Sequence, residues 1–352
     1  MYMDVVRVDG QYWLCEKLGF RMFSELFCML FIIHYLMFTP GEIYLAHDIL
    51  QECDVAVKFK PTTSEHQMLE HEYNVMRTLG EGVSIPRLYL FSHEGHFNVI
   101  IFDCLGPSIQ DLYMHLKSIT TISALALQMV FTILVFLIAH AHLNFVDLLP
   151  PIHSHNFVHQ DLKPSNILMG VRNCVSILHV INFGLENQFR SHDTHLHILF
   201  CGRLGLTGTP LFALNNSHAS CELGRQDDFE SLAYVLIYLL HGGLPWEGLA
   251  DSALVTQQKL DCSVKEVCSG LPNEFATFLS YLHSLPFKDK PDYEFLSGLF
   301  DHLQQCEGFH DDALSDWDVM RHVVSIMPSP TVNISHKWKP PITYTHRTGW
   351  IH

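Results

Sequence analysis

Three polar side chains that could act on a phosphoryl group lie close together in the chain. Asp161, Lys163 and Asn166 fall in the run Val-His-Gln-Asp-Leu-Lys-Pro-Ser-Asn, and an apolar stretch then leads to Asn182-Phe183-Gly184. A carboxylate can accept the proton of an attacking hydroxyl, a lysine can balance charge on the moving group, and amide oxygens can ligate Mg²⁺. The spacing predicts phosphoryl-transfer chemistry, with Asp161 and Lys163 as catalytic residues and Asn166 and Asn182 as metal ligands.

A second pair of residues, in an earlier strand and helix, predicts a site for nucleotide phosphates. Lys58 lies in the apolar strand Asp54–Phe59, at the position from which a lysine reaches the α- and β-phosphates. Along the following helix Met68, Glu72 and Met76 are spaced by four, so Glu72 shares a face with apolar residues that must be buried. A buried carboxylate needs a cation, and we expect Lys58 to supply it. The alternative is an unpaired strand lysine and a solvated glutamate.

Two strands ahead of Lys58 should form a hairpin whose turn covers the phosphates. The first runs over residues 5–18 into Gly19, and the second starts at Gly41. Backbone N–H groups in a tight glycine turn between such strands can bind phosphate oxygens. Here the 21 residues Phe20–Pro40 intervene, rich in Phe, Leu and Met and without glycine. The phosphate-binding turn is therefore interrupted in the sequence, although Gly19 and Gly41 remain candidate nucleotide-binding residues.

A hinge for the adenine ring is expected farther along the chain. Phe97–Asp103 is a largely apolar strand. The family resemblance given below implies that backbone groups from Asp103 to Leu105 bind adenine, with Phe102 behind it. Asp103 and Leu105 are thus the remaining candidate nucleotide-binding residues. Ser108 should then begin a helix.

Composition limits the class of protein and of partner. The 352 residues can form one two-lobed domain of about 250 to 300 residues plus short ends. With 48% hydrophobic and 16% charged residues the chain should fold, and a formal charge of -16 argues against nucleic acid or an anionic membrane as the main partner. Ten cysteines without a Cys-x-x-Cys pair indicate a reduced environment, and we expect a cytoplasmic or nuclear protein.

Two apolar runs raise the alternative of a membrane span. Ile119–Ala139 has no charge over 21 residues, which is long enough to cross a bilayer. Gln128 and several Ser and Thr residues dilute this run, however, and a buried helix is expected ahead of the catalytic loop. Leu26–Phe38 has only 13 residues and is interrupted by His34. We expect neither run to span a membrane.

Together these motifs resemble the casein kinase I family of serine/threonine protein kinases over roughly residues 5–322. The resemblance implies an α+β, two-lobed protein kinase fold, with a small β-rich N-lobe and a larger α-helical C-lobe. It also implies transfer of the ATP γ-phosphate to Ser or Thr of proteins with Mg²⁺ as cofactor. Residues 1–10 would be an extension, 11–322 the kinase domain and 323–352 a loosely ordered tail. The family markers are Gly41–Leu45, Leu105–Ser108, Ile152–Ser154, Leu206–Thr209, Arg225–Leu232, Leu244–Trp246, Glu274–Thr277 and Lys290–Tyr293.

Three substitutions depart from the family pattern. Gln160 stands where most kinases have Arg, and Asn182 stands where the metal-binding Asp is expected. Asn182 offers Mg²⁺ one neutral carbonyl oxygen in place of a full negative charge, so binding of Mg²⁺ and of ATP should be weakened. Leu211 replaces an arginine near the anion-binding substrate site, which argues against a preference for acidic or phosphorylated substrates.

Two segments have no counterpart in the family pattern: residues 20–40 and about 130–150. Both are apolar and similar in length, as translated retained introns in a misassigned coding sequence would be. Three interpretations follow. The chain is a casein kinase I-like enzyme with reduced activity, a catalytically dead pseudokinase that binds a scaffold partner, or a product that carries introns. Finding both segments in the dominant transcript would contradict the third.

Overall fold

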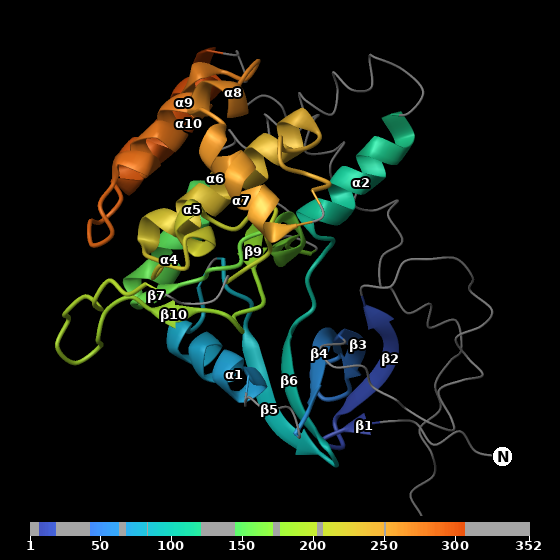
Figure 1. Cartoon of the computed structure of the whole chain (residues 1–352). Helices are drawn as coiled ribbons and strands as arrows, with labels where there is room; N and C mark the ends of the chain where they lie inside the picture. Colours follow the sequence, from blue (N-terminus) through green and yellow to red (C-terminus); the bar gives the residue numbers. More distant parts are fainter. Residues whose placement is uncertain are drawn as a thin grey trace, which may run out of the picture.

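The smaller lobe is built on one antiparallel sheet. The computed structural model describes residues 7–18, 43–62, 68–82, 84–120, 145–171, 177–202, 207–249 and 251–306. Six strands pair in the order β1-β2-β3-β4-β6-β5, and helix α1 lies against β5 and β6 (Figure 1). The elements are β1 (Arg7–Val8), β2 (Tyr12–Leu18), β3 (Ile43–Asp48), β4 (Cys53–Pro61), α1 (Met68–Leu79), β5 (Leu88–Glu94) and β6 (Phe97–Asp103).

Strand β4 contributes side chains to both faces of this sheet. Val55, Val57 and Phe59 are buried in a cluster on one face, whereas Ala56 belongs to the main core on the other. Successive side chains of a strand point to opposite faces, so Lys58 shares the face of Ala56. The alternation therefore places the Lys58 side chain on the side of the sheet that faces α1.

The strands β2 and β3 pair as the sequence predicts. Tyr12 lies opposite Asp48, and the register runs to the pair Leu18 and Ile43 at the other end. The two strand ends that residues 19–42 connect are thus direct neighbours. Gly19, Gly41 and the insertion 20–40 lie outside the described residues.

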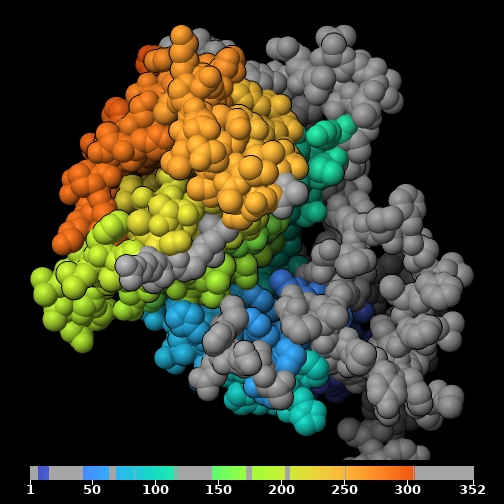
Figure 2. Space-filling view, viewed as in Figure 1, coloured from blue at the N-terminus to red at the C-terminus, as the bar shows by residue number. Residues whose placement is uncertain are grey.

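The larger lobe is mainly helical and lies above the β-rich lobe in the view of Figures 1 and 2, with α1 on the side of β7 and β10. Two short antiparallel pairs, β7 with β10 and β8 with β9, lie between the lobes. The helices are α2 (Ile109–Thr120), η1 (Phe145–Leu148), α4 (Leu149–Ser154), η2 (Pro164–Asn166), α5 (Asn215–His218), α6 (Arg225–His241), α7 (Ser252–Asp261), α8 (Val264–Val267), α9 (Asn273–Ser284) and α10 (Tyr293–Cys306). The strands are β7 (Phe157–Val158), β8 (Ile167–Met169), β9 (Leu178–Val180) and β10 (Asn187–Gln188).

Helix α6 is the central element of this lobe. All of its residues from Gln226 to Leu239 are buried, the polar ones of its first turns included. Gly242 ends the helix in the left-handed region, at a φ of 82°, and its N–H is donated to the carbonyl oxygen of Tyr238 at 2.9 Å. The helix therefore provides a rigid support on which the loops of the site can rest.

The two apolar runs are largely outside the described ranges. Of Ile119–Ala139 only the first two residues are described, at the end of α2, and Leu26–Phe38 is not described. No helix within the described part of the chain has the length and apolar character needed to cross a bilayer. Phe145, Val146 and Leu149 are buried in the main core. The last part of the predicted second insertion thus contributes to the core of the larger lobe.

Candidate active site

A buried ion pair joins the sheet to α1. Lys58 Nζ lies 2.7 Å from both carboxylate oxygens of Glu72, and the two side chains are 10% and 7% exposed. Lys58 Nζ also donates a hydrogen bond of 3.1 Å to Asn182 Oδ1. The predicted contact between Lys58 and Glu72 is therefore present, and it fixes α1 close to the sheet.

The loop after β7 places Asp161 and Lys163 side by side. Asp161 Oδ2 accepts a hydrogen bond of 2.8 Å from Lys163 Nζ. Asp161 Oδ1 accepts from the backbone N–H and the hydroxyl of Thr209, at 2.9 and 2.8 Å. Lys163 Nζ donates to the same hydroxyl at 2.8 Å. Thr209 thus bridges the two predicted catalytic residues, a contact across 48 positions that local spacing cannot reveal.

Asn166 connects this loop to the segment that carries Asn182. Its Nδ2 donates to the Asp161 carbonyl oxygen at 2.8 Å and to Asp161 Oδ2 at 3.3 Å. The backbone carbonyl oxygen of Asn166 accepts a hydrogen bond from the backbone N–H of Ile181 at 3.0 Å. These bonds place both predicted metal ligands at the same pocket, from two different segments.

The backbone around Asn182 adopts an uncommon conformation. Asn182 has a φ of 71°, a region in which Asn is better tolerated than most residues. Phe183 is fully buried, and its ring packs edge-on against His159 with 5.2 Å between the ring centroids. His159 Nε2 lies 3.1 Å from the carbonyl oxygen of Ile181. The residues before and after Asn182 are therefore both held in place by contacts with His159, and these contacts fix the backbone from which the Asn182 side chain extends.

Asp228, at the start of α6, supports the loop from below. Its carboxylate accepts the backbone N–H groups of His159 at 2.8 Å and of Gln160 at 2.9 Å. Gln160 has a φ of 68° and is 8% exposed. The Asp228 carboxylate therefore holds a strained backbone at the residue just before Asp161.

A pocket of about 250 Å³ lies between the two lobes. Four predicted site residues, Lys58, Glu72, Asn166 and Asn182, line it, and so does Phe102. Sequence reasoning missed three more lining residues, Ile43, Ser165 and Ile181. Ile43 and Ile181 are apolar residues adjoining the predicted motifs, and only that adjacency could have indicated them.

The structure does not bring every predicted residue to the pocket. Its lining residues include neither the predicted catalytic residues Asp161 and Lys163 nor the predicted nucleotide-binding residues Asp103 and Leu105. The carboxylate of Asp103 turns to β5, where it accepts from the Tyr89 hydroxyl and the Arg87 N–H, both at 2.8 Å, and the Asp103 N–H is donated to Arg87 O. The Asp103 N–H and side chain are thus engaged in the sheet, so any adenine contact by this residue would use its carbonyl group.

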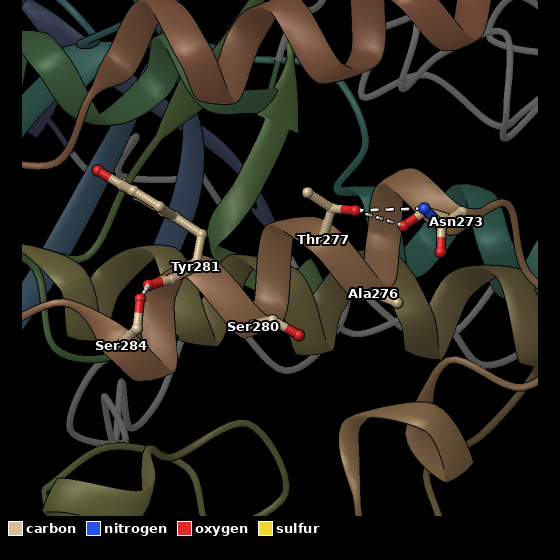
Figure 3. A pocket seen from close by; sticks show the side chains of 6 residues that line it. All are labelled: Asn273, Ala276, Thr277, Ser280, Tyr281 and Ser284. Atoms are coloured by element: carbon tan, nitrogen blue, oxygen red, sulfur yellow. Dashed lines mark hydrogen bonds between the residues drawn. The ribbon is translucent and has the colours of Figure 1, made fainter.

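A larger hollow of about 470 Å³ lies far from these residues, on the outer face of α9 (Figure 3). It is shallow, and every residue that lines it comes from this one helix. None of them is charged, so the hollow offers no group for phosphoryl transfer. The lining residues are Asn273, Ala276, Thr277, Ser280, Tyr281 and Ser284.

The pocket fits nucleotide phosphates better than it fits Mg²⁺. Lys58 supplies a buried cation for phosphate oxygens. The predicted metal ligands Asn166 and Asn182 offer only neutral amide oxygens, and Asn182 Oδ1 is already bonded to Lys58. Mg²⁺ prefers carboxylate oxygens. Among the described residues no cluster of three His, Cys, Asp or Glu side chains is placed to hold a metal ion.

A second buried carboxylate adjoins the ion pair and was not expected from the sequence. Glu186 has a fully buried side chain, and burial, together with the nearby Glu72, raises its pKa to about 8. His71 Nε2 on α1 approaches Glu186 Oε1 at 2.7 Å, although neither oxygen accepts a well-aligned hydrogen bond. Glu186 therefore lies at the contact between α1 and the segment that follows Asn182.

One comparison with known proteins bears on this arrangement. A family model described as the protein kinase domain matches residues 39–290, which is more than half of the chain. The match starts at the end of the first insertion and covers β3 to α9, including every described residue of the pocket. With its two-lobed α+β fold, the chain belongs to the protein kinase family.

Proposed function

We propose that this protein is a casein kinase I-like serine/threonine protein kinase that transfers the ATP γ-phosphate to Ser or Thr of proteins, at a reduced rate. One observation carries the proposal: the Lys58–Glu72 ion pair is closed in the same structure that aligns Asp161 with Lys163. Kinase chemistry needs such an ion pair in place, together with a carboxylate that accepts the proton of the attacking hydroxyl.

Each polar side chain then has a separate role. Lys58, held by Glu72, binds the α- and β-phosphates. Asp161 accepts the proton of the attacking hydroxyl, and Lys163 balances charge on the transferred group. The Thr209 hydroxyl forms hydrogen bonds with both side chains and keeps them next to each other. Asn166 and Asn182 are the residues that would hold Mg²⁺, which would neutralise phosphate charge when bound.

Serine/threonine specificity rests on the resemblance of the chain to the casein kinase I family. One contact in the structure and one feature of the sequence favour a reduced rate. Neither Asn166 nor Asn182 carries a charge. Asn182 Oδ1 already accepts a hydrogen bond from Lys58 Nζ, so it is less able to bind a metal ion. The insertion 20–40 interrupts the glycine turn between β2 and β3. Each feature weakens the hold on the triphosphate without removing Asp161.

The alternative is a pseudokinase that binds nucleotide and acts as a scaffold for another protein. The hydrogen bond from Lys58 Nζ to Asn182 Oδ1 favours it, because that bond uses the one oxygen Asn182 can offer. A nucleotide could then bind through Lys58 alone, without phosphate transfer.

The test combines nucleotide binding with phosphate transfer. Thermal unfolding of the full chain is followed with ATP, with and without Mg²⁺, because a ligand of the folded state raises the midpoint. Transfer from radiolabelled ATP to dephosphorylated casein and to a basic protein is measured beside Asp161→Asn. We expect labelled Ser or Thr with the wild type only. A midpoint raised by ATP without any transfer above Asp161→Asn would establish the scaffold alternative.

A further inference from the structure

A chain of hydrogen bonds runs from the last described helix to the catalytic loop. The Tyr293 hydroxyl, at the start of α10, lies 3.0 Å from His153 Nδ1 on α4. His153 Nε2 lies 3.0 Å from Asp228 Oδ2 on α6. Asp228 in turn accepts the N–H groups of His159 and Gln160. Five residues from four segments thus connect α10 to the backbone beside Asp161.

Which atom donates each hydrogen bond follows from the Asp228 carboxylate, which can only accept. The Asp228 carboxylate already accepts two backbone N–H groups, so His153 Nε2 beside it must carry a hydrogen. In a neutral imidazole Nδ1 is then an acceptor, and the Tyr293 hydroxyl must donate to it. A histidine bound in this way has its tautomer set by the partner of its other nitrogen.

The residues of this chain of bonds are largely shielded from solvent. His153 and Asp228 are 3% and 1% exposed, and Tyr293 is half-buried. The ring of Phe229 packs edge-on against His153 at 5.8 Å and beside the Tyr293 ring at 5.7 Å. Burial raises the pKa of Tyr293 to about 12, so its hydroxyl keeps its proton at neutral pH.

We propose that Tyr293 is a positioning residue for the catalytic loop: its hydroxyl holds the proton of His153 on Nε2, and that proton keeps Asp228 bonded to the loop. The inference deepens the proposed kinase function and rests on it for any effect on rate. Tyr293 lies beyond residues 39–290, the stretch that matches the kinase family model. The start of α10 is therefore part of the machinery that supports Asp161.

Tyr293→Phe tests this directly, since it removes the hydroxyl and keeps the ring against Phe229. We expect the backbone N–H groups of His159 and Gln160 to exchange with solvent about tenfold faster, because a support of their hydrogen-bond acceptor is lost. Phosphate transfer should slow through kcat, with the KM for ATP unchanged. Hydrogen exchange of residues 157–162 is measured alongside the steady-state kinetics.

Tyr281→Phe is the matched control. The Tyr281 hydroxyl accepts the N–H of Asp292 at 2.9 Å, so this variant loses a hydrogen bond next to Tyr293 without touching His153. Equal exchange at His159 and Gln160 in wild type and Tyr293→Phe, or equal acceleration in both variants, would overturn the proposal. A wild type that transfers no phosphate would contradict only the proposed function, since the exchange comparison needs no activity.

A measurement on the wild-type protein tests the proposal even if the Tyr293→Phe variant does not fold. The ¹⁵N chemical shifts of His153 report which ring nitrogen carries the hydrogen. We expect a neutral ring protonated on Nε2. A ring protonated on Nδ1, or on both nitrogens, would overturn the role assigned to the Tyr293 hydroxyl.

Discussion

Lys58 Nζ is held by three oxygen atoms, two from Glu72 and one from Asn182. An aspartate at position 182 could give one oxygen to the lysine and a second, charged oxygen to a metal. An asparagine has a single oxygen, and its other terminal group is an N–H donor that repels a cation. The chemistry of the side chain at position 182 therefore limits how strongly the pocket can bind Mg²⁺.

Asn182→Asp should therefore increase phosphate transfer. If the missing charge costs about 3 kcal/mol in the transition state, the rate rises roughly a hundredfold on restoration. The comparison is kcat/KM for ATP at saturating Mg²⁺, with Asn74→Asp on the exposed side of α1 as control for added charge. An unchanged rate in Asn182→Asp would place the defect elsewhere, such as in the interrupted turn.

Glu186 makes folding stability depend on pH. Its folded pKa of about 8 lies above the ordinary value of 4.5, so between these values the folded state keeps a proton that the unfolded chain loses. Its contribution to stability is complete below about pH 4.5 and falls as pH rises to about 8. Glu186→Gln removes this dependence, and its midpoint should exceed that of the wild type by more at pH 8 than at pH 5.

Thermal unfolding across this pH range is the measurement. Glu294→Gln, an exposed carboxylate at the start of α10, is the matched control and should give a constant difference. Parallel curves for Glu186→Gln and wild type would show that Glu186 ionises normally in the fold.

At the scale of elements, the site depends on close contact between the loop before η2 and the segment after residue 206. Gly208 has a φ of 87°, and a Cβ built there would lie 2.5 Å from the Gln160 carbonyl oxygen. Only a glycine permits this approach, which brings the Thr209 N–H to Asp161. Helix α6 supports the same loop from its other side through Asp228.

Gly208→Ala should accordingly cost both stability and activity. The left-handed conformation costs an alanine about 1 kcal/mol, and the clash with Gln160 adds about 1–3 kcal/mol or displaces the loop. Gly270→Ala separates the two effects, because Gly270 has a φ of 84° with no atom near its Cβ position. Urea unfolding of both variants gives the difference. Equal losses of unfolding free energy in Gly208→Ala and Gly270→Ala would mean that the segment around residue 208 shifts without cost to avoid the clash with Gln160.

For the whole molecule, the described sheet of the smaller lobe brings the two ends of the connection 19–42 together. The register of β2 and β3 ends at Leu18 and Ile43, so removing residues 20–40 leaves Gly19, Gly41 and Glu42 as a short turn. Such a turn restores two glycines to the place where nucleotide phosphates are expected.

A chain that lacks residues 20–40 should fold with the same sheet. Shortening the connection from 24 residues to three lowers the entropy of closing it, which is worth about 2 kcal/mol. We expect a higher midpoint in urea and a larger midpoint shift with ATP. Loss of cooperative unfolding on deletion would show that the segment is needed for the fold, and would argue against its origin as an intron.

Much of the site could be predicted because its residues are close in sequence or follow a simple period. The strand that carries Lys58 and the helix that carries Glu72 are recognisable from alternation and from spacing by four. The elements that end outside the described residues, among them the turn at Gly19 and Gly41, stay predictions. The contacts of Asp103 were not foreseeable, since the direction of its side chain depends on β5.

The sequence alone predicted phosphoryl transfer, through the order and spacing of Asp161, Lys163 and Asn166, and predicted that Asn182 weakens it. Tertiary structure decided which distant groups hold these residues. Thr209 meets Asp161 across 48 positions, and Tyr293 meets His153 across 140. Glu186 is buried beside α1. Such contacts arise only when separate elements pack, because hydrogen bonds and burial depend on distances in space and not along the chain.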